Sequence, residues 1–168
     1  MLSDNVNRLK EHYLYVHTHK MNGIPILNKK LDVETVGFVE WEKSESEVGI
    51  LITPWFMNLV LLPKKEIQQE IRVGKLVNIL FPDGEYSFLT QIDEDFGVYL
   101  TCSLFSPMSD FQTQEQAIET AEAIMAQLLQ TEKFKKQKRE EDKKQKDEKN
   151  QEVLTKVTSR RDFLRGSK

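Results

Sequence analysis

Cysteine is almost absent from this sequence of 168 residues, which contains Cys102 and no other. One thiol can form neither an internal disulfide nor a four-thiolate metal site within the chain. No apolar stretch reaches the roughly 18–20 residues needed to cross a bilayer, and residues 1–10 lack the cationic-then-apolar order of a secretory signal. We therefore expect a cytoplasmic protein with no stable membrane insertion.

Motifs of catalysis are missing as well. The sequence has no glycine-rich phosphate loop, no Gly-x-Ser-x-Gly elbow and no His-Glu-x-x-His pair. Its three histidines, His12, His17 and His19, fall in one segment, and His17 and His19 would point to different sides of a helix. This spacing favours a solvated helix face over a metal site. We expect a protein that is not an enzyme and that uses no metal or cofactor.

Charge is distributed unevenly behind the net value of -3. Acidic residues dominate the part before Thr131, whereas lysine and arginine crowd the last quarter. Binding a phosphate backbone requires a basic face, so the acidic body argues against nucleic acid and favours a cationic ligand. Because most large apolar residues precede Phe134, we expect a domain over residues 1–131 and a charged extension over 132–168.

The spacing of apolar residues predicts a helix, a series of strands and a second helix. Val6, Leu9 and Tyr13 recur every three or four residues, as on a helix over 4–20 that starts at Ser3 or Asp4. Thr113 and Gln116 form a capping-box pattern ahead of an apolar stripe that continues to Leu128. Between the helices we expect strands at residues 36–42, 48–53, 57–62, 76–81, 86–92 and 98–105.

Turn residues between these runs predict how the strands pair. Pro82-Asp83-Gly84 is typical of a hairpin turn, and short polar breaks elsewhere predict an antiparallel meander. The expected fold class is α+β, with a mostly antiparallel sheet of five or six strands flanked by an N-terminal and a C-terminal helix that cover one face. A short helix fits residues 65–72. Residues 135–151 contain no apolar side chain and are either an exposed helix or disordered.

Two apolar runs beside prolines are the candidates for a contact surface. Composition leaves open whether they form core or a binding surface, because aromatic residues and methionine are common in both. Cys102 begins the second run and is either a small buried residue or a reactive thiol. The side chains proposed for one apolar surface are Trp55, Phe56, Met57, Phe105, Pro107 and Met108.

The C-terminal residues Ser159 to Arg165 resemble the consensus of a twin-arginine export signal. The matching positions are Arg160, Arg161, Phe163 and Leu164. A working signal lies at the N-terminus and continues into an apolar stretch, so we do not expect this motif to direct export. A solvated basic tail is the simpler interpretation of the motif by itself.

In their order along the chain, the runs Thr-Pro-Trp-Phe-Met-Asn-Leu (residues 53–59) and Cys-Ser-Leu-Phe-Ser-Pro-Met (102–108) and the terminal Arg-Arg motif resemble HybE-type nickel-iron hydrogenase assembly chaperones. The similarity spans residues 22 to about 129 and the tail, and the charged segment 133–151 is longer than the family pattern leads us to expect. Some relatives carry a fused rubredoxin, which one cysteine does not allow here.

The resemblance implies a cytoplasmic chaperone that holds a hydrogenase precursor, with the small subunit and its twin-arginine leader as the expected client. It adds Asn58 and Cys102 to the six apolar residues as partner-binding candidates, and it suggests that the tail motif imitates the client's leader. Carboxylates that border the predicted strands would receive the client's arginines. These candidates are Glu40, Glu42, Asp93, Glu94 and Asp95.

A rival hypothesis is an accessory protein that handles a metal or a thiol through Cys102 and the N-terminal histidines. A third is an adaptor whose charged helix binds acidic surfaces, with a strong dependence on salt.

Overall fold

The computed structural model describes residues 2–65 and 72–165, without the side chains of residues 42, 132–134, 137 and 157–165. The chain divides into two compact units, residues 1–129 and 130–168, which are described separately below. The short helix expected over residues 65–72 falls largely outside the described residues.

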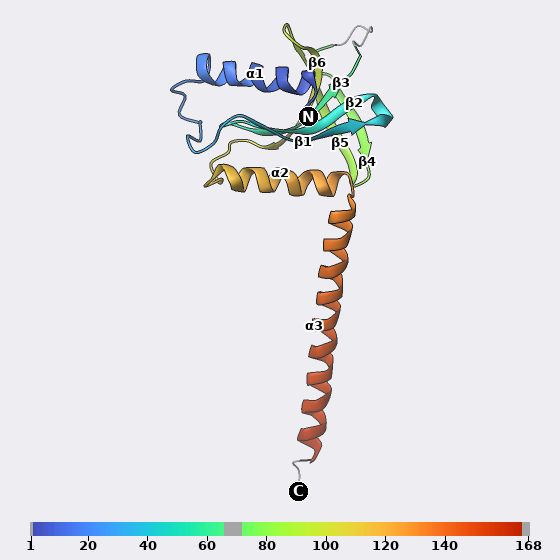
Figure 1. Cartoon of the computed structure of the whole chain (residues 1–168). Helices are drawn as coiled ribbons and strands as arrows, with labels where there is room; N and C mark the ends of the chain where they lie inside the picture. Colours follow the sequence, from blue (N-terminus) through green and yellow to red (C-terminus); the bar gives the residue numbers. More distant parts are fainter. Residues whose placement is uncertain (1, 66–71, 166–168) are drawn as a thin grey trace. The chain divides into compact units, whose positions relative to one another are not determined.

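The described residues of the first unit form two helices, a single helical turn and six strands (Figure 1). In chain order these are α1 (Asp4–His19), β1 (Glu34–Trp41), the 3-10 turn η1 (Glu42–Ser44), β2 (Ser46–Ile52), β3 (Met57–Pro63), β4 (Leu76–Phe81), β5 (Gly84–Asp93), β6 (Gly97–Phe105) and α2 (Gln114–Leu128). The expected α+β class is thus confirmed, and the predicted strands agree with the observed ones to within about two residues at each end.

The six strands form one antiparallel sheet in the order β1-β2-β3-β6-β5-β4. The hairpin predicted at Pro82-Asp83-Gly84 is confirmed, since Phe81 and Gly84 are paired across it. The continuous meander is wrong in one place, because β3 pairs with β6 and not with β4. The connection between β3 and β4 is longer than the tight turns elsewhere, so it does not force these two strands to be neighbours.

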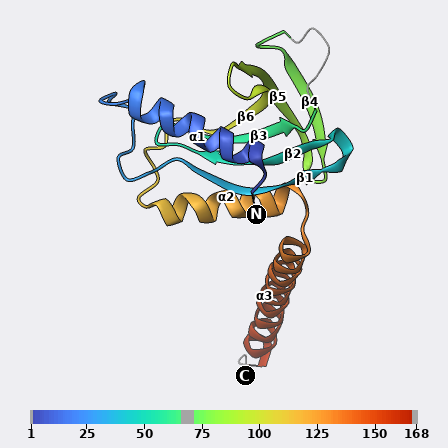
Figure 2. The same cartoon turned by 45° about the horizontal axis from the view of Figure 1, so that its top comes forward.

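Both faces of the sheet are buried, in contrast to the single covered face expected from the sequence. Alternate residues of the central strands point to opposite sides: Leu59 of β3 joins a core with α2, whereas Val60 joins a core with α1. Figures 1 and 2 show α1 and α2 on opposite faces of the sheet. The α1 core contains Val6, Leu9, Val33, Leu51, Val60, Leu62 and Tyr99.

The helix ends follow from local chemistry. The Ser3 hydroxyl accepts a hydrogen bond from the Val6 N–H and caps α1, and Thr113 caps α2 in the same way through the N–H of Gln116. The side chain of Gln116 reaches back to the N–H of Gln112, so two otherwise unpaired donors at the start of α2 are satisfied.

The second unit is dominated by α3 (Glu132–Arg165), a helix of 34 residues. At 1.5 Å per residue it is about 50 Å long. The described side chains from residue 138 to 156 are exposed, so the segment takes the exposed-helix alternative rather than the disordered one. No helix within the described residues is long and apolar enough to cross a membrane.

Gly49 of β2 provides a test of the sheet packing. A Cβ atom built at this position would lie 2.3 Å from Cγ and Cδ2 of the Phe38 ring, which covers the glycine from β1. We expect Gly49→Ala to lower the free energy of unfolding by about 1–3 kcal/mol, because the ring must move. The measurement is urea denaturation. In a Phe38→Ala background the cost should disappear, and an equal cost in both backgrounds contradicts the proposed clash.

Candidate functional site

The first apolar run forms a tight turn between β2 and β3. The N–H of Thr53 donates to the carbonyl of Phe56 over 2.8 Å. The Thr53 hydroxyl accepts hydrogen bonds from the N–H groups of Trp55 and Phe56, at 3.3 and 2.9 Å. Thr53 is fully buried, so these bonds satisfy polar groups inside the protein and fix the direction of the two aromatic side chains.

Asn28 joins this turn to the second apolar run. Its N–H donates to the carbonyl of Pro54 over 2.8 Å. Its side-chain amide donates to the carbonyls of Met108 and Phe111, at 2.9 and 2.8 Å. One residue of the α1–β1 connection therefore holds together the ends of two runs that are about fifty positions apart in the sequence. Sequence reasoning missed Asn28, because nothing local distinguishes it from other polar loop residues.

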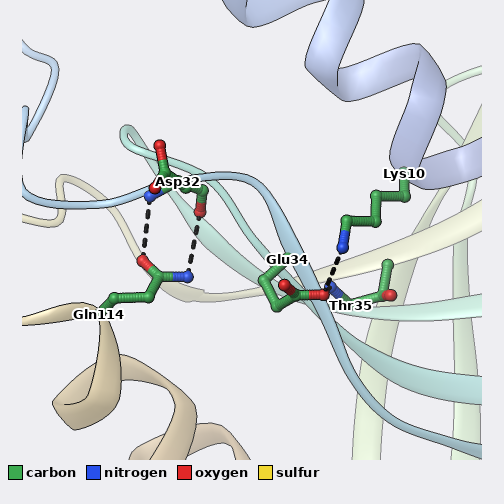
Figure 3. Close-up of polar contacts among 5 residues, drawn as sticks. All are labelled: Lys10, Asp32, Glu34, Thr35 and Gln114. Carbon is green, nitrogen blue, oxygen red and sulfur yellow. Dashed lines mark hydrogen bonds and ion pairs between the residues drawn. The ribbon is translucent and has the colours of Figure 1, made fainter.

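The same connection is fastened to both helices (Figure 3). The side chain of Gln114 in α2 accepts from the N–H of Asp32 at 2.9 Å and donates to its carbonyl at 3.4 Å. Lys10 of α1 forms an ion pair with Glu34 at 2.7 Å, and that carboxylate also accepts from the N–H of Thr35. The end of the loop is thus held to α2, and Glu34, the first residue of β1, is held to α1.

Trp55 and Phe56 are half-buried against α1. The Phe56 ring meets Tyr13 edge-on at 5.6 Å between centroids, and Trp55 lies 6.0 Å from His17. The Tyr13 hydroxyl is 2.9 Å from that of Tyr99, and burial, followed by the neighbouring Tyr99, raises the pKa of Tyr13 well above its ordinary value. The pair therefore stays protonated at neutral pH and anchors α1 over the aromatic side chains.

The second apolar run presents its aromatic residue on the α2 side. Phe105 is 37% exposed and packs edge-on against Phe111 at 5.1 Å, and Pro107 is exposed. Met57 and Met108 are fully buried in the α2 core, so the expectation that their side chains face outward is wrong. Each fills space in the core close to the exposed residues. Asn58 is partly buried in β3 beside Met57, and Cys102 lies further along β6, opposite Leu59. The other candidates lie around one end of the sheet, and the eight do not form a single flat surface.

A cavity of about 500 Å³ opens beside Pro54. Its apolar lining includes Ile24 and Leu27 of the α1–β1 connection, and His17 and Asp32 are among its polar residues. Within the described part of the chain no partner is recorded for the Asp32 carboxylate, although its backbone is held by Gln114. The cavity is also lined by Asn22 and Lys29, so its lining is mixed. Its apolar side chains and the Asp32 carboxylate together can accommodate a side chain that combines an apolar stem with a positive charge.

The carboxylates expected to receive client arginines lie elsewhere. Asp93, Glu94 and Asp95 are at the β5–β6 turn, a full strand from Phe105, which is roughly 27 Å for the length of β6. Glu40 forms an ion pair with Lys64 at the corresponding end of β1, and the side chain of Glu42 is outside the described residues. Asp32 is the acidic residue that borders the cavity beside Pro54.

The sequence predicts all three histidines on a solvated helix face, but one of them does not lie there. His12 is largely buried, with Nε2 3.3 Å from Asp93 and Nδ1 3.8 Å from Asp95. Within the described residues, the ligand atoms of His12, Asp93 and Asp95 are close enough to share a metal ion. Carboxylates face both ring nitrogens, so His12 links α1 to the β5–β6 turn.

Cys102 and the histidines lie on opposite faces of the sheet. Cys102 is half-buried, pairs with Leu59 in the α2 core, and carries no disulfide. Burial raises the pKa of its thiol above the ordinary value, which lowers the fraction of reactive thiolate. A shared site formed by this thiol and the α1 histidines, as the rival hypothesis requires, is therefore incompatible with the fold.

The tail motif belongs to α3, which extends to Arg165. The side chains of Arg160, Arg161, Phe163 and Leu164 are outside the described residues, so their role stays a prediction.

A family model described as NiFe-hydrogenase assembly, chaperone, HybE matches residues 4–166. This chain belongs to that family. The match covers the two apolar runs and α3 with the whole tail motif, so the resemblance seen in the sequence is confirmed.

Direct comparison also finds similar proteins. The chain is 36% identical over 155 residues to the hydrogenase expression/formation protein HupJ of Bradyrhizobium diazoefficiens, which covers 92% of this chain and 83% of that protein. It is 36% identical to protein HoxT of Cupriavidus necator, over 73% of this chain and 74% of HoxT. It is 41% identical to the probable rubredoxin HupJ of Rhodobacter capsulatus but spans only 40% of the length of that relative.

The solution structure of HybE from Escherichia coli has the same fold. It superposes with a TM-score of 0.61 over 78% of this chain and 80% of HybE, at 20% sequence identity. The description of the family names hydrogenase assembly, and HupJ of Bradyrhizobium diazoefficiens is named for hydrogenase expression and formation. This chain therefore belongs to a family of hydrogenase assembly chaperones.

We predict that Asn28→Asp lowers the free energy of unfolding by about 1–3 kcal/mol, because the two side-chain hydrogen bonds to Met108 and Phe111 are lost. Urea denaturation at neutral pH measures the effect. Asn22→Asp is the matched control, since it makes the same change of charge at an exposed position and should alter stability by less than about 0.5 kcal/mol. Equal effects of the two substitutions would show that Asn28 does not join the segments.

We also predict that Cys102 reacts slowly with iodoacetamide in the folded protein. Since burial raises its pKa, the thiolate forms at higher pH than in the unfolded chain, and the midpoint of alkylation rate against pH moves upward. Mass spectrometry of the alkylated chain, with and without urea, gives both midpoints. A midpoint at or below that of the unfolded chain contradicts the burial argument.

Proposed function

We propose that this protein holds the precursor of a nickel-iron hydrogenase subunit in the cytoplasm until cofactor loading and subunit pairing are complete. The proposed client is the small subunit with its twin-arginine leader. Binding takes place at the end of the sheet where Trp55, Phe56, Phe105 and Pro107 surround the segments joined by Asn28.

The observation that carries this proposal is the partial exposure of large apolar side chains on a rigid frame. Phe105 is 37% exposed, and Trp55 and Phe56 are half-buried, although all three come from segments fixed by hydrogen bonds. Apolar groups that are ordered but incompletely buried are suited to a partner, because little conformational entropy is lost when they bind. Aromatic residues are also enriched in protein interfaces.

The excess of acidic residues before Thr131 fits a basic client. Asp32 borders the cavity beside Pro54, within the acidic body of the chain. A charge-assisted hydrogen bond from an arginine contributes roughly 1.5–3 kcal/mol, and burial of one aromatic side chain contributes a similar amount. After the cost of association, such contacts give a dissociation constant of the order of micromolar. A protein that must release its client needs no tighter binding.

The test is a titration of the small-subunit precursor, and of a synthetic twin-arginine leader peptide, into wild type and a Trp55→Ala/Phe105→Ala variant. We expect the variant to bind the precursor at least tenfold more weakly, because two aromatic contacts are lost. A Leu14→Ala/Val39→Ala variant is the matched control, since it removes two exposed apolar side chains elsewhere. Unchanged affinity in a folded Trp55→Ala/Phe105→Ala variant would rule out this surface.

We further propose that Ser159 to Arg165 imitates the client's leader. A tethered motif competes at an effective concentration of the order of millimolar if it can reach the site. A chain that ends at Val157 should then bind the leader peptide more tightly than the full chain. Full-length protein with Arg160→Gln and Arg161→Gln should show the same gain. Equal affinities for all three proteins would leave the tail without a competing role.

A further inference from the structure

Strand β4 is an unpaired edge of the sheet. It pairs with β5 on one side, and the described part of the chain places no strand on the other. Figures 1 and 2 show it at the margin of the sheet, away from α1. A strand in this position offers backbone N–H and C=O groups to any extended segment that lies beside it.

The register identifies which backbone groups face outward. The carbonyl of Lys75 accepts from the N–H of Thr90, and Phe81 pairs with Gly84 across the two-residue turn. Inward and outward groups alternate along an antiparallel edge. The N–H and C=O groups of Leu76, Asn78 and Leu80 therefore point away from β5, and those of the residues between them bond to β5.

The same strand exposes apolar side chains. Leu76 is 65% exposed and Leu80 is 68% exposed. They point to the α1 face of the sheet, because the alternate residues Val77 and Ile79 pack against the α2 core. At Leu76 and Leu80 the backbone N–H and C=O groups point away from β5 and the side chains are exposed. An edge strand with these features can bind an extended chain that has apolar residues on the same face.

The opposite edge of the sheet, β1, has several features that hinder the addition of another strand, and β4 lacks them. Lys10 pairs with Glu34, Lys64 pairs with Glu40, and a bulge interrupts the strand between Val36 and Val39. Both α1 and α2 contact β1. Charges and bulges of this kind prevent strand addition. The six residues of β4 carry no charge, and their pairing with β5 is regular.

Charges at the two ends of β4 set the direction of an added strand. Arg72 and Lys75 are exposed before its first residue, and Glu85 is exposed on β5 opposite Leu80, near the other end of β4. An antiparallel segment would begin near Glu85 and end near Arg72 and Lys75. Basic residues at its N-terminal end and acidic residues at its C-terminal end would complement these charges, whereas a parallel segment of that composition would meet like charges.

We infer that β4 binds an extended segment of the hydrogenase precursor as a seventh, antiparallel strand, with apolar residues beside Leu76 and Leu80 and a basic residue near Glu85. This assignment rests on the proposed chaperone function and adds a second contact to it. Backbone hydrogen bonds give affinity that tolerates different sequences, which suits a subunit whose own strands are not yet paired.

The experiment uses the full chain and two synthetic peptides, acetyl-Arg-Val-Thr-Thr-Thr-Val-Glu-amide, whose valines are four positions apart like Leu76 and Leu80, and its exact reverse sequence. Amide hydrogen exchange is followed by NMR with and without peptide. The forward peptide should protect the amides of Leu76, Asn78 and Leu80 from exchange. The reverse peptide should bind more weakly, because its antiparallel pairing brings like charges together at both ends.

Substitutions on the two edges form a matched pair. Leu80→Lys should weaken binding of the forward peptide about tenfold, because it removes an apolar contact and places a charge on the edge. Val39→Lys makes the same kind of change at an exposed position of β1 and should leave binding unchanged. Equal binding by both variants, or equal binding of the forward and reverse peptides, overturns the directional edge assignment.

The purified precursor separates this inference from the proposed function. If the precursor binds and the three β4 amides become protected, the edge assignment is supported. Precursor binding without that protection overturns the edge assignment and leaves the chaperone function intact, whereas failure of the precursor to bind overturns the chaperone function. Protection that appears without any ligand and increases with protein concentration shows that a second copy occupies the edge, which also overturns the assignment.

Discussion

The hydrogen bonds of Asn28 are the constraint on which the candidate site depends. Three segments that are distant in the sequence meet at this residue: the α1–β1 connection, the Thr53–Phe56 turn and the residues that follow β6. Without these bonds the carbonyls of Pro54, Met108 and Phe111 would need other partners, and buried polar groups are costly to leave unpaired. The aromatic side chains around Asn28 are ordered because the backbone beneath them is fixed.

The fold has features that suit the binding of another polypeptide. Its central strands are apolar on both sides, α1 and α2 cover opposite faces, and the partly exposed aromatic residues surround one end of the sheet. Among the partly buried titratable groups, Tyr13 and Tyr99 share a hydrogen bond, and burial raises the pKa of the Cys102 thiol. Membership of the HybE family agrees with a protein that acts by holding another polypeptide.

Local patterns in the sequence predicted the elements, because their signals lie within a few residues. Thr113 and Gln116 marked the start of α2, and Pro82-Asp83-Gly84 marked the β4–β5 hairpin. The pairing of β3 with β6 and the second covered face could not be predicted, since they depend on contacts between distant segments. At the site, the two apolar runs were identified, but burial of Met57 and Met108 and the roles of Asn28 and Asp32 emerged only from the fold.

The most direct measurement is photo-crosslinking in cells that produce the hydrogenase. A photoreactive phenylalanine analogue is placed at Trp55, at Phe105 or at the control position Val39 of the full chain, and crosslinked products are identified by mass spectrometry. The account predicts that positions 55 and 105, but not 39, capture a hydrogenase subunit that still carries its leader. Equal capture at all three positions, or capture of the mature subunit alone, would contradict it.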